Sequence, residues 1–487
     1  MRKRCLFQIG LIIVLLTGVA YFLSCATNPV TGKTEFMLMS ESQEIQLGRE
    51  SDPQITGAYG LYQDASLTQY IDDLGQRMAT ISHRPNLQFT FRVLDSPVVN
   101  AFAVPGGFVY VTRGILAYMN NEAELAGVLG HEIGHITARH TAKQYSKAQL
   151  ASLGLNIGKM ISDDFRRYAG LAELGVGLLF LRFSRDNERQ ADELGVAYSS
   201  KIGYDATNMS NFFNTLDRLA DGAAQGGLPG WFSTHPNPAD RVVATRNMAT
   251  DWQRDLGTGN WQVNREQYLR TIEGLVYGQD PRQGFVRENT FYHPALRFQF
   301  PVPEGWQVNN LPTQVQIVSP ENDAAIILTL EEGTNPQRAA QQFADRSKGQ
   351  VHFEEKVEVN GLQGYRLLSD IQSEETSMRI LSYFIAKDTR IYILHGLSSP
   401  DRFSSYQDTF NRTMTDFAPL RDRNIITIQP NRIKIVRVEE TAPFQTVIEK
   451  YTLPDVAAED LALMNGLTTD EAVTAGTLIK VIESKEK

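Results

Sequence analysis

The chain has 487 residues, of which 42% are hydrophobic and 21% charged, and its formal net charge is −9. This length leaves room for about two to four globular domains. The acidic balance argues against a nucleic-acid-binding protein, which would need a basic face to displace counterions. The two cysteines, Cys5 and Cys25, lie within the first 25 residues. We therefore expect neither a disulfide nor a thiolate-ligated metal site in the mature chain, so a metal would have to bind to His, Asp or Glu.

The N-terminal residues are typical of an export signal. Basic residues at 2–4 precede an uncharged apolar stretch at 11–23, which is shorter than the ~20 residues that span a membrane. The stretch ends just before Cys25 and resembles a bacterial lipoprotein signal, which implies removal of residues 1–24 and lipidation of the Cys25 thiol. Ala26 stands where an aspartate commonly retains such proteins at the inner membrane, so for a Gram-negative source the resemblance favours the periplasmic face of the outer membrane. A plain secretory signal or an uncleaved anchor is the alternative.

Helical and strand patterns alternate over the following 250 or so residues. Ser40 and Gln43 form a capping-box pattern, which predicts that a helix begins near Ser40. A long apolar run at 171–183 is interrupted by Glu173 and is too short for a membrane span, so we interpret it as a buried core helix. The other predicted elements are helices at 66–81, 121–144 and 148–190, and strands at 88–94, 99–104 and 108–112.

The sequence His131-Glu132-Ile133-Gly134-His135 lies within the predicted helix 121–144. A spacing of four residues puts both imidazoles on one helical face, where they can share a metal ion. Glu132 follows the first ligand directly and can act as the general base for a water bound to the metal. The apolar residues on either side predict the buried helix that this motif requires. We therefore expect one Zn²⁺ per chain.

A zinc site for catalysis needs a third protein ligand and an open position for water. Glu188 is the best candidate, because it lies on a predicted helix with Asp192 four residues later. Glu188 can bind the metal, while Asp192 can accept a hydrogen bond from the far nitrogen of a ligand histidine and fix its tautomer. The competing interpretation is a solvated charged helix face.

Together these motifs resemble the HtpX-like gluzincin metallopeptidases, a family that includes the CAAX prenyl endopeptidases. The stretch Asn100–Gly107 resembles the strand and turn beside the active site of that family, and Ser233–Pro236 with Asp240-Arg241 resembles its closing motif. The resemblance covers about residues 41–248. It implies zinc ligation by His131, His135 and Glu188, with Asp192 in the outer shell. It further implies that the chain belongs to the exported branch of this family, which contains quality-control proteases of the bacterial envelope.

Two parts of the site have open roles. Asn100, Ala101, Phe102 and Ala103 would pair with the backbone of an extended substrate by strand addition, although an ordinary core strand is the alternative. His235 can stabilise the oxyanion, or it can occupy the fourth zinc position and displace water, as the resemblance implies for related periplasmic proteases. A third interpretation is a structural histidine that caps the next turn. His140 lies five residues after His135, off the metal face, and we expect it at the surface.

Composition changes near residue 275, and a linker pattern at 278–284 separates the downstream segments. Residues 285–420 predict strands with one clear helix at 336–348 and weakly resemble PsbP/Mog1-like domains. Residues 425–484 predict the order strand, helix, helix, strand and resemble a LysM module, although Glu439-Glu440-Thr441 replaces its usual Gly-Asp-Thr. The segment would tether the protein to peptidoglycan or serve as a protein-interaction module.

The predicted fold is therefore multidomain. A mainly α, zincin-type α+β peptidase domain with a small edge sheet (25–275) follows the signal peptide (1–24). An α+β domain (285–420) and a small βααβ LysM-like module (425–484) complete the chain. The predicted function is a zinc metalloendopeptidase of the bacterial envelope that cleaves unfolded or misassembled proteins. The alternative is a zinc-locked, chaperone-like envelope assembly factor with little proteolysis.

Overall fold

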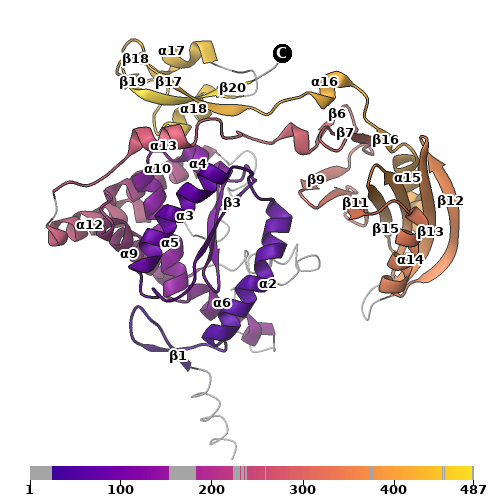
Figure 1. Cartoon of the computed structure of the whole chain (residues 1–487), viewed down its shortest axis with the longest axis horizontal. Helices are drawn as coiled ribbons and strands as arrows, with labels where there is room; N and C mark the ends of the chain where they lie inside the picture. The colour runs from indigo at the N-terminus through magenta and orange to yellow at the C-terminus, as the bar shows by residue number, and fades with distance from the viewer. Residues whose placement is uncertain are drawn as a thin grey trace, which may run out of the picture. The chain divides into compact units, whose positions relative to one another are not determined.

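The computed structural model describes residues 25–152, 183–222, 231, 235, 239–257, 259–372, 377–451, 453 and 456–484. The predicted signal peptide 1–24 and most of the predicted core helix 171–183 lie outside these residues. The chain divides into two compact units (Figure 1). The first unit runs to Gly278 and also includes Asn431–Glu483, and the second unit is Gln279–Pro430.

The N-terminal part of the first unit places helices around a small sheet. Its first elements are β1 (Cys25–Thr27), β2 (Thr34–Phe36), α2 (Glu41–Tyr59), α3 (Ala65–Thr80), β3 (Thr90–Leu94), β4 (Ala101–Val104) and β5 (Phe108–Thr112). The capping box predicted at Ser40 is confirmed at the start of α2. In the three-stranded sheet the order is β3-β5-β4, with β3 parallel and β4 antiparallel to β5. This order leaves β4 at an edge of the sheet.

Helices dominate the rest of this part of the unit. They are α4 (Arg113–Tyr118), α5 (Glu122–Thr137), α6 (His140–Ser152), α9 (Arg185–Lys201), α10 (Thr207–Gly222), α12 (Ala239–Leu256) and α13 (Arg265–Thr271). The predicted single helix 121–144 is wrong, because the chain breaks at Arg139, whose φ is +56°. The Arg139 guanidinium donates hydrogen bonds to Glu44 and to the Met39 carbonyl. These contacts with residues about 100 positions earlier hold the break.

Glycines allow α5 and α9 to approach closely. A Cβ atom at Gly130 would lie 3.0 Å from the Cα of Gly195, and one at Gly195 would lie 3.0 Å from the backbone nitrogen of His131. A Cβ at Gly134, inside the metal motif, would lie 3.2 Å from the Ala191 carbonyl oxygen. The two helices therefore touch backbone to backbone, which brings side chains on α5 and α9 within reach of one ion.

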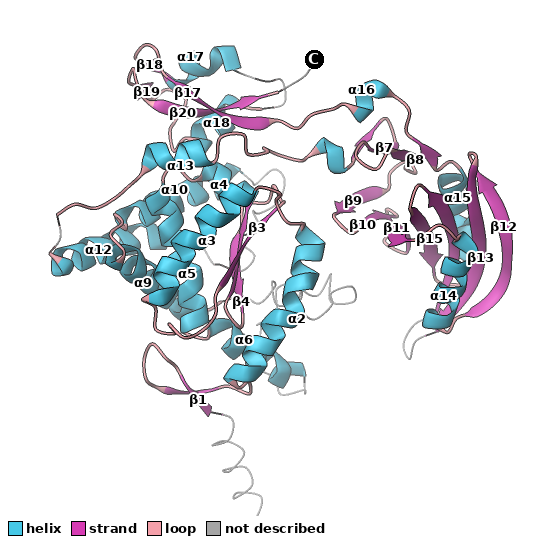
Figure 2. Cartoon of the chain, viewed as in Figure 1, coloured by secondary structure: helices cyan, strands magenta, loops and turns pink. Residues whose placement is uncertain are grey.

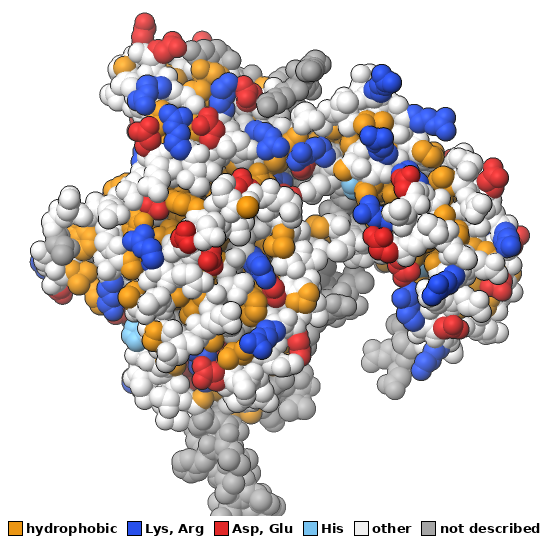
Figure 3. All heavy atoms as spheres, viewed as in Figure 1, with side chains coloured by type: hydrophobic (Ala, Val, Ile, Leu, Met, Phe, Trp, Pro, Cys, Tyr) orange, Lys and Arg blue, Asp and Glu red, His pale blue; other side chains and the backbone are white. Residues whose placement is uncertain are grey.

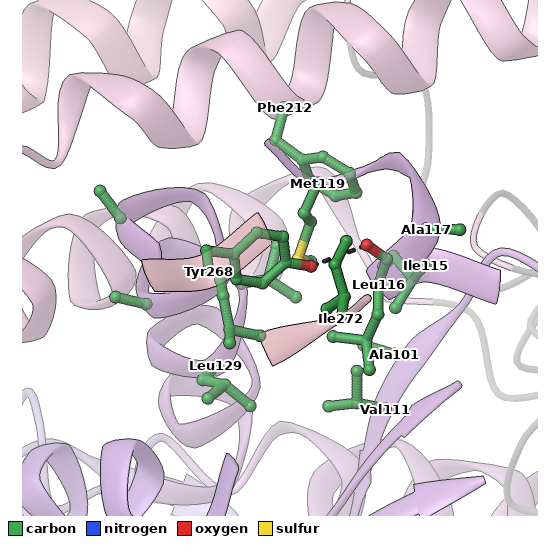
Figure 4. Close-up of a cluster of buried hydrophobic side chains, with 14 of the residues drawn as sticks. Ala101, Val111, Ile115, Leu116, Ala117, Met119, Leu129, Phe212, Tyr268 and Ile272 are labelled. Carbon is green, nitrogen blue, oxygen red and sulfur yellow. Dashed lines mark hydrogen bonds between the residues drawn. The ribbon is translucent and has the colours of Figure 1, made fainter. Parts of the chain in front are cut away.

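Helix α5 is buried along its whole length. Asn121 caps its N-terminus by accepting a hydrogen bond from the Glu124 backbone. Around it lies the apolar cluster shown in part in Figure 4, where Leu129, Phe212 and Ile272 are each at most 1% exposed. The buried Tyr268 hydroxyl donates to the Leu116 carbonyl at 2.7 Å, so this polar atom is satisfied inside the core. A rigid, fully buried helix thus carries the metal motif.

The C-terminal segment of the first unit contains β17 (Arg432–Arg437), β18 (Ala442–Pro443), α17 (Phe444–Ile448), the 3₁₀ turn η4 (Glu449–Tyr451), α18 (Ala458–Met464), β19 (Ala472–Val473) and β20 (Leu478–Glu483). β17 and β20 pair antiparallel, which agrees with the predicted order strand, helix, helix, strand. The LysM-like assignment itself stays a prediction.

The apolar residues of this segment join the same hydrophobic cluster as those of α5. Lys480 is fully buried and its ammonium donates to the carbonyls of Ala117 and Met119.

The second unit is rich in antiparallel strands (Figure 2). A seven-stranded sheet has the order β12-β13-β14-β15-β11-β10-β9, and a four-stranded sheet has the order β16-β8-β7-β6. The elements are η3 (Pro281–Gln283), β6 (Phe285–Arg287), β7 (Thr290–His293), β8 (Phe298–Pro301), β9 (Gln307–Leu311), β10 (Gln314–Val318), β11 (Ala324–Glu332), α14 (Pro336–Ser347), β12 (Gln350–Val359), β13 (Leu362–Gln372), β14 (Ser377–Lys387), β15 (Arg390–Ser398), α15 (Phe403–Thr415), β16 (Ala418–Pro419) and α16 (Arg423–Ile426).

The prediction of one clear helix in this segment is wrong, because α15 is a second one. Its sequence is rich in Ser and Thr, which have weak helix propensity. Phe403, Phe410 and Met414 lie on one face and are buried in the core of the unit. Packing against the sheet therefore outweighs weak local propensity.

Over the described residues, no helix combines the length and apolar character needed to cross a membrane. On the face of the molecule shown in Figure 3, basic and acidic side chains are interspersed. This mixture agrees with the modest net charge of the sequence.

Candidate metal centre

Four side chains from three parts of the first unit converge on one point. His131 and His135 come from α5, Glu188 comes from the first turn of α9, and His235 precedes α12. Their ligand atoms all lie within 4.8 Å of one another. All four side chains are at most 2% exposed. A buried group of three imidazoles and a carboxylate is a donor set typical of zinc sites.

The spacing of these atoms fits a tetrahedral ion. Zinc–nitrogen bonds of about 2.0–2.1 Å place neighbouring ligand atoms of a tetrahedron about 3.3 Å apart. The Nε2 atoms of His131 and His135 are 3.0 Å apart, and Nε2 of His135 lies 3.5 Å from Oε1 of Glu188. Nδ1 of His235 lies 3.4 Å from Nε2 of His131 and 2.9 Å from Oε1 of Glu188. The residues present therefore fit a four-coordinate metal.

Asp192 contacts the far side of His131. Its Oδ1 lies 2.9 Å from Nδ1 of His131, one turn of α9 beyond Glu188. Burial would raise the pKa of Asp192, but the charges of Arg241 and His131 outweigh burial and lower it. Asp192 is thus an anion that can accept the Nδ1 proton of His131, which leaves Nε2 free as a ligand.

Sequence reasoning missed the role of Arg241, which it noted only as part of a motif. The guanidinium donates to both oxygens of Asp192, at 2.6 and 2.8 Å, and its Nη1 lies 2.9 Å from Oε2 of Glu188. Arg241 lies over the ring of Phe213, with 4.2 Å between guanidinium carbon and ring centroid. The charge of a buried arginine thus compensates the charges of two buried carboxylates. The sequence does not reveal this pairing, because the three residues come together only in the folded chain.

Glu132 points into the same buried region. Both of its carboxylate oxygens are buried without a well-aligned hydrogen-bond partner in the described part of the chain. Nε2 of His235 lies 3.8 Å from Oε1 of Glu132. Burial and the nearby charge of Glu188 raise the pKa of Glu132 well above its ordinary value. A buried carboxyl group held for proton transfer has these properties.

His235 is fully buried and stacks on Trp231. The two rings are 4.2 Å apart between centroids and 20° from parallel. The backbone nitrogen of Trp231 donates to the carbonyl of Val99, just before β4, and the nitrogen of His235 donates to the carbonyl of Trp231. Of the predicted closing motif, His235, Asp240 and Arg241 are described, whereas Ser233, Thr234 and Pro236 lie outside the described residues. In this structure His235 therefore occupies the metal cluster rather than the surface.

The prediction that His140 lies at the surface is wrong. His140 is 1% exposed, and its Nδ1 lies 3.1 Å from Nδ1 of His135. Its Nε2 contacts Oε1 of Gln190 at 2.9 Å. Burial lowers the pKa of His140 to about 4. The error arises because the chain breaks at Arg139, so that helical spacing from His135 no longer tells where the ring of His140 points.

The predicted substrate strand is β4 with Asn100 before it. Its residues are at most 8% exposed, and its side chains pack on both faces of the sheet. Phe102, for example, stacks on Tyr110 with 4.9 Å between ring centroids. The edge position that strand addition requires is present, while the strand itself is covered in this structure.

Comparison with known proteins agrees with this site. Residues 65–249 match the model of peptidase family M48. This match contains the metal cluster and supports the HtpX-like resemblance. The chain is 33% identical over 236 residues to the beta-barrel assembly-enhancing protease of Escherichia coli (strain K12), which is 46% of this chain and 48% of that protein. It is 29% identical over 235 residues to the mitochondrial metalloendopeptidase OMA1 of Schizosaccharomyces pombe, covering 46% of this chain and 66% of that protein.

The chain spans about half the length of the bacterial relative that it matches. Among solved structures, cyanobacterial PsbP from Synechocystis sp. PCC 6803 matches 27% of this chain and 91% of its own, with a TM-score of 0.24 and 12% identity. Mog1p, a Ran-binding protein of Saccharomyces cerevisiae, matches with a TM-score of 0.22 and 12% identity. The family match and the buried donor set together support a metallopeptidase site.

Proposed function

We propose that this protein is a zinc-dependent endopeptidase of the bacterial cell envelope that cleaves unfolded or misassembled proteins. One observation carries the proposal: four buried ligand atoms at tetrahedral spacing lie beside the buried carboxyl group of Glu132. The name of the matched Escherichia coli relative, a beta-barrel assembly-enhancing protease, supports envelope proteins as the substrate class.

In this proposal His131, His135 and Glu188 hold the metal. When bound, zinc would supply a Lewis acid that polarises the scissile carbonyl and acidifies water. Glu132 takes the proton of the attacking water and returns it to the leaving amine, for which its place beside the ligand cluster suits it. Asp192 and Arg241 keep the imidazole of His131 in the ligating orientation.

The substrate would enter as an extended strand along β4. Backbone pairing selects for an extended conformation rather than for a sequence, which favours unfolded chains. The edge position of β4 and its packing against α5 support this path. The backbone nitrogen of Trp231 donates to the carbonyl of Val99, two residues before this strand, so this hydrogen bond occupies a backbone acceptor beside the proposed path.

Metal removal tests the proposed activity directly. We expect the purified chain without residues 1–24 to contain about one zinc per molecule and to digest casein. Dialysis against a chelator should abolish digestion, and stoichiometric zinc should restore it. A chain that keeps full activity after the metal is removed would refute the proposal.

A second candidate function follows from the position of His235. Nδ1 of His235 occupies the fourth corner of the cluster, where an attacking water would otherwise bind. This arrangement favours a zinc-locked state with little proteolysis, in which the protein acts as a chaperone-like assembly factor until the histidine withdraws. The oxyanion role is the competing proposal for the same residue.

The two roles of His235 predict opposite changes. If His235 locks the site, His235→Ala should raise the basal rate of casein cleavage at equal zinc content. If it stabilises the oxyanion, the same change should lower the turnover number by about 10²-fold or more. A fall in rate would therefore exclude the locked state.

We further propose that Cys25 is lipidated and holds the protein at the periplasmic face of the outer membrane. The basic and apolar N-terminal pattern supports this location. Cys25→Ala should then abolish palmitate labelling and release the protein from the membrane fraction. Residues 425–484 would add a LysM-like contact with peptidoglycan, which a pull-down with insoluble peptidoglycan would test.

A further inference from the structure

A chain of buried polar contacts extends from the metal cluster through His135. Nδ1 of His135 lies 3.1 Å from Nδ1 of His140, and Nε2 of His140 lies 2.9 Å from Oε1 of Gln190. His135 and His140 are 0% and 1% exposed, so solvent does not compete for these nitrogens. His140 opens α6, while Gln190 lies on α9 two residues after Glu188. Three helices thus contribute to one line of contacts.

The proton positions along this line follow from donor and acceptor rules. An amide oxygen only accepts, so Nε2 of His140 must carry a hydrogen toward Gln190. In a neutral imidazole, Nδ1 of His140 is then an acceptor, and the nitrogen opposite it on His135 must donate. With its hydrogen on Nδ1, His135 presents the lone pair of Nε2 to the cluster, as ligation requires.

We propose that His140 and Gln190 are positioning residues that hold His135 in its metal-binding tautomer. This inference rests on the proposed metal site and extends it. The two ligand histidines are then held differently, since the carboxylate of Asp192 accepts from His131 while a neutral imidazole accepts from His135. A neutral acceptor adds no further anion to a buried cluster that already contains Glu132, Glu188 and Asp192.

The orientation of the Gln190 amide determines which atom is the donor in each hydrogen bond along this line of contacts. If its nitrogen faced His140, the proton order would reverse, and Nε2 of His135 would carry a hydrogen toward the cluster. Changes at Gln190 therefore test the inference without touching a ligand. Gln190 is only partly buried, so its replacement leaves the core intact.

The experiment compares full-length variants loaded with zinc or cobalt(II). Gln190→Met removes the acceptor, Gln190→Glu keeps one, His140→Phe removes both nitrogens, and His140→Asn keeps an oxygen near the position of Nδ1. Zinc affinity is measured by competition with a chromophoric chelator. In the cobalt(II) protein, NMR detects the hyperfine-shifted ring N–H proton of each ligand histidine, which exchanges slowly with solvent only while it is hydrogen-bonded.

We expect Gln190→Met and His140→Phe to weaken zinc binding by about 10-fold or more, the usual effect of losing an outer acceptor. The ring N–H signal of His135 should vanish in His140→Phe, while that of His131 persists. Gln190→Glu and His140→Asn should retain most of the affinity.

Unchanged affinity and an unchanged His135 signal in both Gln190→Met and His140→Phe would overturn the inference. So would weaker binding with the His135 signal intact, because that result would indicate a packing role. Failure of the wild-type chain to bind zinc would instead refute the proposed function itself.

Discussion

The two compact units contrast a partly buried histidine, His395, with two fully buried ones, His131 and His135. In the second unit His395 contacts the Ser382 hydroxyl at 2.7 Å and stacks on Phe343 with 4.6 Å between ring centroids. A neutral partner and an aromatic neighbour satisfy that ring locally. In the first unit His131 and His135 turn their Nε2 atoms toward each other at 3.0 Å, beside carboxylates. A partly buried histidine with local partners is therefore a packing feature, whereas converging nitrogens and carboxylates indicate a metal site.

The units also differ in how their charges are compensated. Asp370 and Arg379 of the second unit form a bidentate pair between β13 and β14, and both side chains are partly exposed. Partly exposed pairs of this kind typically contribute at most about 1 kcal/mol to stability. In the first unit Arg241 is buried with Asp192 and Glu188, a costly arrangement that a fold retains where it has a use. The following predictions test whether the buried polar residues of the first unit act in catalysis and metal binding, while those of the second unit act only in packing.

The largest effect is expected at Glu132. Glu132→Gln should retain zinc but lower casein cleavage by about 10²–10⁴-fold, because the ligands survive while the proton acceptor is lost. Metal analysis and digestion on the same sample measure both quantities. The matched control is Ser382→Ala, which removes the partner of the partly buried His395 in the second unit and should leave cleavage unchanged. Cleavage at the wild-type rate by Glu132→Gln would contradict the mechanism.

Next come the two acidic residues of α9. Glu188→Gln should weaken zinc binding more than Asp192→Asn, because it removes an anion at the metal rather than an outer acceptor. Loss of the outer acceptor should cost about 10–100-fold in affinity. Chelator competition on the two variants measures the difference. Equal affinity of Glu188→Gln and wild type would remove Glu188 from the site.

A smaller effect concerns the contact between α5 and α9. Gly195→Ala places a methyl group 3.0 Å from the backbone nitrogen of His131, so the helices must separate. We expect a loss of about 1–3 kcal/mol in the free energy of unfolding, as for other overpacked cores, together with weaker zinc binding. Urea unfolding and chelator competition measure the two effects. Gly361, around which a Cβ would meet nothing within 4 Å, is unsuitable as a control because its φ is +83°.

Gly259 provides the matched control, since a Cβ there also meets nothing within 4 Å and no positive φ opposes it. Gly259→Ala should change neither stability nor zinc affinity measurably. If Gly195→Ala behaves like Gly259→Ala, close approach of the two helices does not limit the site.

The smallest effect is expected at His395. Burial lowers its pKa from 6.5 to about 4 in the folded protein. At a pH between these two pKa values, His395 binds more protons in the unfolded chain than in the folded chain. The free energy of unfolding therefore falls as the pH falls. From pH 6.5 to 5.5 the loss attributable to His395 should be about 1 kcal/mol. The double variant His395→Phe/Ser382→Ala should show a correspondingly shallower pH dependence of its urea midpoint, and an unchanged slope would contradict this origin.

Much of the metal site could be predicted because its signals are local. A spacing of four residues places His131 and His135 on one face of any helix, and the same holds for Glu188 and Asp192 on another. The observed α5 and α9 carry these pairs and bring them together. The sequence analysis did not predict α15, because its residues have weak helix propensity. The contacts that stabilise this helix are with the sheet of the second unit.

The sequence by itself determined the chemistry of this protein: the type, order and helical spacing of the residues that can bind zinc and move a proton. Tertiary structure alone decided which further groups hold them. Arg241 reaches Asp192 and Glu188 across some 50 positions, and His140 turns inward only because Arg139 breaks the helix to bind Glu44. Helical spacing constrains neighbours within one regular element, whereas side chains beyond a break or on another helix are placed by long-range packing and by the cost of burying charge.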